Sequence, residues 1–145
     1  QPKYLERVWC VFEMHTAISM QTCPVEILMP PVEAEKFCSA VESGTATLDS
    51  VWKVLSNIDV EQAEASVPSD KVRIMQLIQE GSGLPDVNAA VSSFLKSWFQ
   101  STVETHVRRL LAQPERTLSE QQLITVCRIA ADLYRDSGDF DRAKD

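Results

Sequence analysis

A long stretch of helical spacing constrains the fold more than any other feature of this sequence. Between residues 84 and 113, apolar side chains recur at intervals of three and four, and no glycine or proline interrupts them after Pro85. This spacing places the apolar side chains along one side of an α-helix. At about 1.5 Å per residue the helix would extend roughly 40 Å, which is long for a compact domain. We therefore expect a helix that connects two modules, with two helices separated near Gln100 and Ser101 as the alternative.

The rest of the chain also predicts a mainly α-helical fold, with one or two short strands. Only 4 of the 145 residues are glycine, which disfavours a loop-rich or all-β fold. Val25–Met29 is apolar almost throughout, as in a parallel strand that is covered on both faces, and Ile58–Val60 is a second, shorter candidate. Further helical patterns begin near Lys3, Pro31, Thr47, Pro68 and Thr117.

Local signals set the expected helix boundaries. Ser66 or Ser69 is expected to cap the helix that follows, and the Gly81–Gly83 segment is expected to end it. Thr117 and Glu120 have the spacing of a capping box, in which each side chain accepts a hydrogen bond from an otherwise unpaired backbone N–H group. The apolar stripes of the helices place on their buried sides, among others, Trp9, Val72, Leu77, Leu123 and Cys127.

The composition disfavours several classes of function. The net charge is −7, whereas binding to nucleic acid or to an acidic membrane requires clustered Lys and Arg. No apolar run approaches about 20 residues, so no membrane-spanning helix is predicted.

The histidines and cysteines indicate no metal site. His15 and His106 lie on separate predicted helices, and the spacing of the cysteines matches no zinc or redox motif. Cysteines in apolar surroundings are typical of reduced thiols and indicate a cytoplasmic protein; they are Cys10, Cys23, Cys38 and Cys127.

The segment Arg7–Met14 contains one carboxylate among apolar residues. On a helix, Glu13 shares a face with Trp9 and Cys10, because residues three and four apart are neighbours. A carboxylate close to buried surface is costly unless it is paired or functional. We therefore expect Glu13 to be substantially buried and to contact the region around Ile27 or the helix after it.

The Trp9-Cys10-x-x-Glu13 pattern, followed by the apolar run Val25–Met29 and Pro30-Pro31, resembles the Trp-Cys-x-x-Glu helix of TIR domains, the intracellular Toll/interleukin-receptor/resistance module. The resemblance implies a core strand after this helix. In enzymatic members the glutamate cleaves the nicotinamide–ribose bond of NAD, which would make Glu13 catalytic. The earlier strands and the nucleotide-holding loop of such a domain would lie upstream, so we expect the chain to be a piece of a longer protein.

The C-terminal segment resembles a tetratricopeptide repeat of the kind found in kinesin-light-chain-like arrays. The positions that carry the resemblance are Ala131, Tyr134, Gly138, Phe140 and Ala143. They imply a helix, a turn at the glycine and a second helix that touches the first at the two alanines, although an alanine also precedes Ala131 where a larger apolar residue is usual. One repeat cannot bury its own faces, so the resemblance implies further repeats and protein partners.

These expectations divide the chain into three parts. Residues 1–83 are the C-terminal part of a TIR-like α/β module, residues 84–113 are a long connecting helix, and residues 114–145 are the first, truncated helix pair of a tetratricopeptide-like repeat array. The function that we favour is an intracellular signalling scaffold that binds protein partners through its repeats, with self-association as a further mode and no cofactor. The alternative is a TIR-type NAD+ glycohydrolase with Glu13 as its catalytic residue, inactive as this fragment because catalysis needs a converged pocket. Strand patterns and a nucleotide-holding loop upstream of Gln1 would favour the enzyme.

Overall fold

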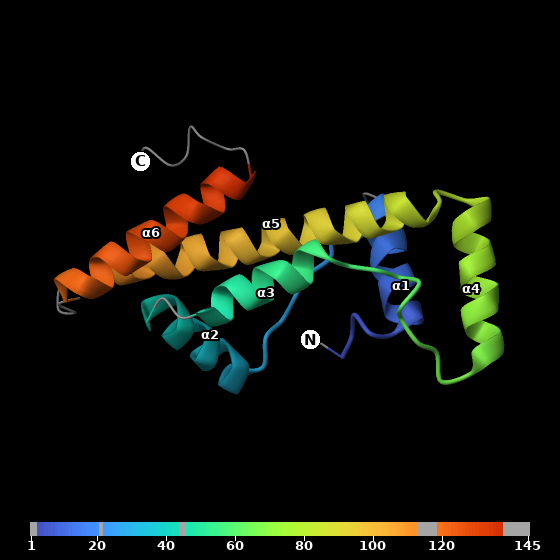
Figure 1. Ribbon diagram of the computed structural model, residues 1–145, viewed down its shortest axis with the longest axis horizontal. Coiled ribbons are helices and arrows are strands. Elements are labelled where there is room, and N and C mark those ends of the chain that lie inside the picture. The colour runs from blue at the N-terminus through green and yellow to red at the C-terminus, as the bar shows by residue number, and fades with distance from the viewer. Residues whose placement is uncertain (1–2, 21, 44–45, 113–118, 138–145) are drawn as a thin grey trace. The chain divides into compact units, whose positions relative to one another are not determined.

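The computed structural model describes residues 3–20, 22–43, 46–112 and 119–137, and these are mainly α-helical (Figure 1). No β-sheet forms among them, and the backbone pairing outside the helices is one parallel bridge between Arg7 and Glu64. The predicted mainly α fold is confirmed. The helices are α1 (Val8–Ser19), α2 (Pro31–Ser43), α3 (Ala46–Ser56), α4 (Pro68–Glu80), α5 (Leu84–Leu111) and α6 (Glu120–Ser137).

The chain forms two compact units, which are described separately below. The first consists of Gln1–Ile27 and Val51–Ser97, and the second of Leu28–Ser50 and Trp98–Asp145. Helix α5 contributes to both units as one continuous helix of 28 residues. The predicted long helix is therefore confirmed over Leu84–Leu111, and α5 has no break near the Gln100–Ser101 pair.

In the first unit, α1 packs against α4, and the start of α5 completes the core. The fully or almost fully buried side chains come from α1, α4, α5 and the segment between α3 and α4: Val8, Val11, Val60, Ala63, Ile74, Ile78, Val87 and Val91. The backbone of Glu64 holds the start of α1, since the Val8 N–H donates to the Glu64 carbonyl at 2.9 Å and the Glu64 N–H donates to the Glu6 carbonyl at 2.7 Å.

Side chains of α5 bond the end of α3 and the irregular segment that follows it. The Asn88 Oδ1 atom accepts a hydrogen bond from the buried Val60 N–H at 3.0 Å, and the Ser92 hydroxyl donates to the Leu55 carbonyl at 2.6 Å. A buried backbone group without a partner costs free energy. Ser92 therefore pairs a carbonyl near the end of α3, and Asn88 allows Val60 to be buried without regular secondary structure.

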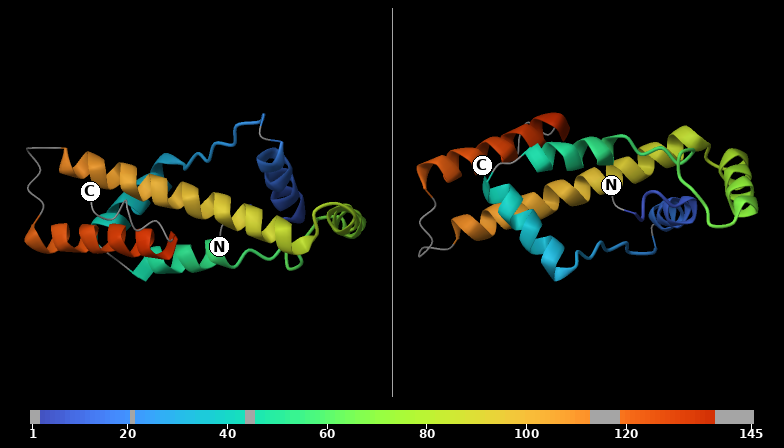
Figure 2. Two further views of the ribbon diagram at one scale, coloured as in Figure 1. Left: turned by 90° about the horizontal axis from the view of Figure 1, so that it is seen from above. Right: turned by 60° about the horizontal axis from the view of Figure 1, so that its bottom comes forward.

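The second unit is built from α2, the C-terminal part of α5, and α6. Phe37 of α2 meets Phe99 of α5 edge to face, with 5.7 Å between the ring centroids, a favourable aromatic geometry. Val41, Phe99 and Val103 are buried. Helix α6 packs against α2 and runs in the direction opposite to α5 (Figures 1 and 2).

The strand predicted at Val25–Met29 is wrong. This segment is extended but pairs with no other strand among the described residues, and Leu28 is 78% exposed. A strand needs a partner for its backbone N–H and C=O groups, and the apolar run alone does not supply one. No strand forms at Ile58–Val60 either, where the buried side chains lead into a turn.

Two capping predictions are also corrected. The residue before α4 is Val67, which provides no side-chain cap, so neither Ser66 nor Ser69 caps this helix. At α6 the capping box is formed by Ser119 and Gln122: the Gln122 N–H donates to Ser119 Oγ at 3.2 Å, and the Ser119 N–H donates to Gln122 Oε1 at 3.0 Å. Thr117 lies outside the described residues.

The predicted break between α4 and α5 is confirmed. The Gly81 N–H donates to the Leu77 carbonyl at 3.1 Å, and the Gly83 N–H donates to the Ile78 carbonyl at 2.8 Å. Gly83 has a φ of 84°, in the left-handed region that glycine adopts at little cost.

Replacement of Asn88 by alanine is expected to lower the free energy of unfolding by about 1–3 kcal/mol, because the buried Val60 N–H would lose its acceptor. The matched control is Asn57→Ala. Asn57 is exposed, and its side-chain amide donates to the nearby Lys53 carbonyl at 2.6 Å, so this change should stay within about 0.5 kcal/mol. Urea unfolding followed by circular dichroism measures both, and equal losses would contradict the role assigned to Asn88.

Candidate functional site

The Trp-Cys-x-x-Glu pattern lies on α1, but Glu13 is exposed. The prediction that Glu13 is substantially buried is wrong. The buried side of α1 is formed by Val8, Val11 and Met14, and at 3.6 residues per turn Glu13 falls on the other side of the helix. Glu13 also makes no hydrogen bond or ion pair with the residues that the structure describes.

Glu13 instead belongs to a small cluster with Tyr4 and Cys10. Partial burial raises the pKa of the Tyr4 hydroxyl above its usual value, and the nearby Cys10 and Glu13 raise this pKa further. Negative charge beside the hydroxyl disfavours the phenolate because like charges repel. The surroundings of Tyr4 therefore favour its protonated hydroxyl.

Trp9 connects α1 to the first turn of α4. Its Nε1–H donates to Asp70 Oδ2 at 3.3 Å, and its ring meets Phe12 edge to face with 6.5 Å between the centroids. Trp9 is 36% exposed, so its predicted place in the core is wrong. The tryptophan of the pattern thus has a visible structural contact, whereas the carboxylate does not.

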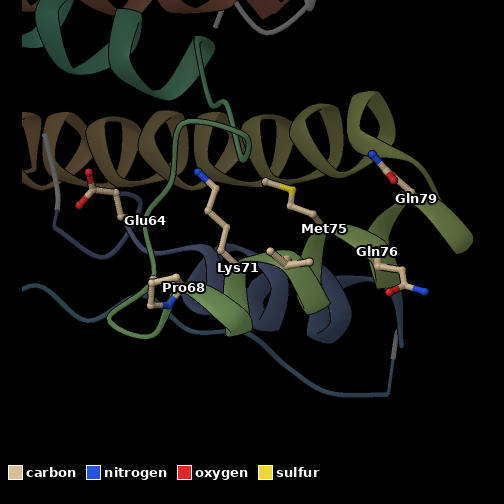
Figure 3. A pocket seen from close by; sticks show the side chains of 8 residues that line it. Glu64, Pro68, Lys71, Met75, Gln76 and Gln79 are labelled. Atoms are coloured by element: carbon tan, nitrogen blue, oxygen red, sulfur yellow. The ribbon is translucent and has the colours of Figure 1, made fainter.

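An open pocket of about 580 Å³ lies along α4 in the first unit (Figure 3). Its lining residues are Glu64, Ala65, Pro68, Lys71, Val72, Met75, Gln76 and Gln79. The Lys71 ammonium group donates to the Glu61 carbonyl at 2.7 Å. No histidine, cysteine or serine lines this pocket, and none of Trp9, Cys10 and Glu13 does. The pocket and the α1 pattern therefore do not form a common catalytic site.

In the second unit, His106 of α5 lies 3.3 Å from Glu42 of α2, measured from Nε2 to Oε1. Both side chains are largely buried, and the contact gives each a polar partner there. Glu42 also lines a shallow polar hollow of about 410 Å³, and the other lining residues are Ser39, Ser43, Gln121, Gln122 and Thr125. The hollow is bordered by α2 and α6.

Helix α6 turns an apolar side to solvent, called here the α6 surface and defined by Leu123, Ile124, Cys127 and Ala131. All are exposed, Leu123 by 40% and Ile124 by 55%. The predicted burial of Leu123 and Cys127 is therefore wrong. Two apolar residues of α4 that were predicted to be buried, Val72 and Leu77, are also exposed, by 69% and 44%.

The structure contains only part of the predicted repeat signature. Ala131 and Tyr134 lie within α6. Gly138, Phe140 and Ala143 lie outside the described residues, as does the turn that they predict. The contact between Ala131 and a second helix therefore stays a prediction.

Sequence reasoning missed the long-range polar contacts of the described residues, among them those of Trp9 and His106. Trp9 and Asp70 are 61 positions apart, and Glu42 and His106 are 64 apart. Within the described part of the chain, no group of three or more His, Cys, Asp or Glu residues is placed to hold a metal ion. The described helices also include none that is long and apolar enough to cross a membrane.

Comparisons of this chain with protein-family models, with curated proteins and with solved structures found no match.

Replacement of Glu13 by glutamine is expected to lower the pKa of Tyr4 while leaving it above the usual value, because burial is the larger cause of the shift. Phenolate absorbance measures this pKa in a Tyr134→Phe background, where Tyr4 is the remaining tyrosine of the two in the sequence. Glu6→Gln removes the same charge elsewhere and should leave the pKa unchanged. An equal fall in both variants would contradict the cluster.

Proposed function

We propose that this protein is an intracellular protein-interaction scaffold in which a TIR-like segment is joined through α5 to a helical-repeat segment that begins at α6. The observation that carries the proposal is the α6 surface. Monomeric soluble proteins rarely expose contiguous apolar patches unless the patches bind something. Leu123, Ile124, Cys127 and Ala131 recur at intervals of three and four, so they form one continuous side of α6.

The repeat resemblance supports the same function. Ala131 and Tyr134 occupy the repeat positions on α6, and arrays of such helix pairs bind other proteins along their exposed helices. The four cysteines, all free, support a reducing compartment such as the cytoplasm. We therefore propose protein partners for the chain, in the cytoplasm, and no cofactor.

The geometry favours the scaffold over the NAD+ glycohydrolase. The enzyme proposal rests on Glu13 and on a pocket that would hold the nicotinamide riboside beside it. Glu13 is exposed, and the pocket of Figure 3 is lined by other residues. A carboxylate stabilises an oxocarbenium-like transition state when it is held against the sugar, and no contact of Glu13 favours that role.

Replacement of Ile124 by serine is expected to abolish the retention of protein partners while the free energy of unfolding changes by no more than about 0.5 kcal/mol, because the side chain is exposed. Affinity purification with quantitative mass spectrometry measures retention. Val72→Ser is the matched control, since it removes a similarly branched, exposed side chain from α4. Equal retention by Ile124→Ser and the unmodified chain, or equal loss in both variants, would contradict a role for the α6 surface.

A further inference from the structure

The open pocket along α4, called here the α4 pocket, presents a cation beside an apolar surface. Lys71 and Met75 extend from the same side of α4 (Figure 3), as residues four apart on a helix do. Pro68 and Val72, which is 69% exposed, enlarge the apolar part of the lining. The pocket can therefore take an apolar side chain at about 6 Å, one helical turn, from an acidic group.

The charge of Lys71 is not neutralised within the described part of the chain. Its ammonium group has three N–H donors and gives one of them to the uncharged Glu61 carbonyl. Glu64, the acidic residue of the lining, forms no ion pair with it. Two donors and the positive charge of Lys71 are therefore left for a carboxylate that enters the pocket.

The backbone at one end of the α4 pocket favours an extended occupant. Glu64 pairs with Arg7 in a parallel bridge. The next residue, Ala65, lines the pocket, and its N–H and C=O groups have no hydrogen-bond partner among the described residues. An extended peptide supplies such partners from its own backbone.

Residues 25–29 of this chain have the features that the α4 pocket requires. They are extended, and their backbone groups bond to no other described residue. Glu26 and Leu28 are exposed, whereas the three residues that alternate with them are half-buried. Two positions apart on an extended segment, Glu26 and Leu28 share a face at a separation of about 6.6 Å. This separation matches that of Lys71 and Met75.

We propose that residues 25–29 of a second copy of this chain occupy the α4 pocket, with Glu26 against Lys71 and Leu28 against Met75. The segment then runs in the same direction as α4, because the acidic residue precedes the apolar one just as the cation precedes the methionine. Leu28 is 78% exposed in its own chain, so it is available to the second copy. The ion pair sets the register and the leucine contributes apolar burial.

This contact goes beyond the proposed function and does not depend on the α6 surface. Each copy carries both the segment and the pocket, so every copy can give one contact and receive another. The half-buried side of residues 25–29 stays on its own chain, and the exposed side makes the contact.

Sedimentation equilibrium of the whole chain measures the association constant. Leu28→Ser and Met75→Ser should each weaken association at least about tenfold, a loss typical of a buried contact in an interface. Leu77→Ser is the matched control, because Leu77 is an exposed α4 residue that does not line the pocket, and it should leave the constant unchanged. A chain that is monomeric at all concentrations, or equal losses in Met75→Ser and Leu77→Ser, would overturn the proposal.

Exchange of charge between copies gives a second test that removes no apolar side chain. Glu26→Lys and Lys71→Glu each place like charges together, so each variant alone should associate at least about threefold more weakly. An equimolar mixture of the two variants should regain the association constant of the unmodified chain, because every contact between unlike copies then pairs opposite charges. A contact within one chain would not respond to mixing. Failure of the mixture to recover would therefore overturn the second copy as the occupant.

Ile124→Ser distinguishes this contact from the α6 surface. We expect the variant to associate as the unmodified chain does, since Ile124 lies on α6. A loss of association in Ile124→Ser as large as that in Leu28→Ser would overturn the α4 pocket as the place where copies meet, and would leave the proposed role of the α6 surface in place.

Discussion

The burial of one side chain on nearly every turn of α5 is the constraint on which both units depend. Val87, Val91 and Leu95 lie in the core of the first unit, and Phe99 and Val103 lie in the core of the second. Each fully buried side chain of this kind contributes about 1.5–3 kcal/mol relative to exposure. An isolated helix gains little of this free energy, so the packing of other segments stabilises α5, and α5 in turn gives those segments a surface to pack on.

Polar side chains of α5 then determine where the irregular parts of the chain lie. Asn88 bonds a backbone group of the segment between α3 and α4, Ser92 bonds the Leu55 carbonyl at the end of α3, and His106 bonds Glu42 of α2. Each contact pairs a polar group that burial would otherwise leave unsatisfied. The same helix therefore provides apolar burial and polar pairing, and the exposed α6 surface lies outside this framework.

The helices could be predicted from the sequence because their spacing and end signals are local. The bounds of α2 and the uninterrupted α5 follow from proline, glycine and the three-and-four spacing. The buried side of α1 could not be predicted in this way, because Trp9 and Phe12 are as apolar as Val8 and Val11. The backbone contact with Glu64 selects between the two sides of the helix.

The contacts of the candidate functional site depend still more on residues that are distant in the sequence. The Trp9–Asp70 and Glu42–His106 contacts have no local signal, and an apolar stripe such as that of α6 indicates a core and a binding surface equally well.

The continuity of α5 is the central claim, and a distance measurement between spin labels at its two ends tests it most directly. Asp86 and Arg109 are exposed, so both can be replaced by cysteine and labelled after the native cysteines are changed to serine or alanine. A continuous helix predicts a single narrow distance distribution near 35 Å between the labelled backbone positions, at about 1.5 Å per residue. A broad distribution, or one centred well below this distance, would show that α5 breaks within the chain and would contradict the account.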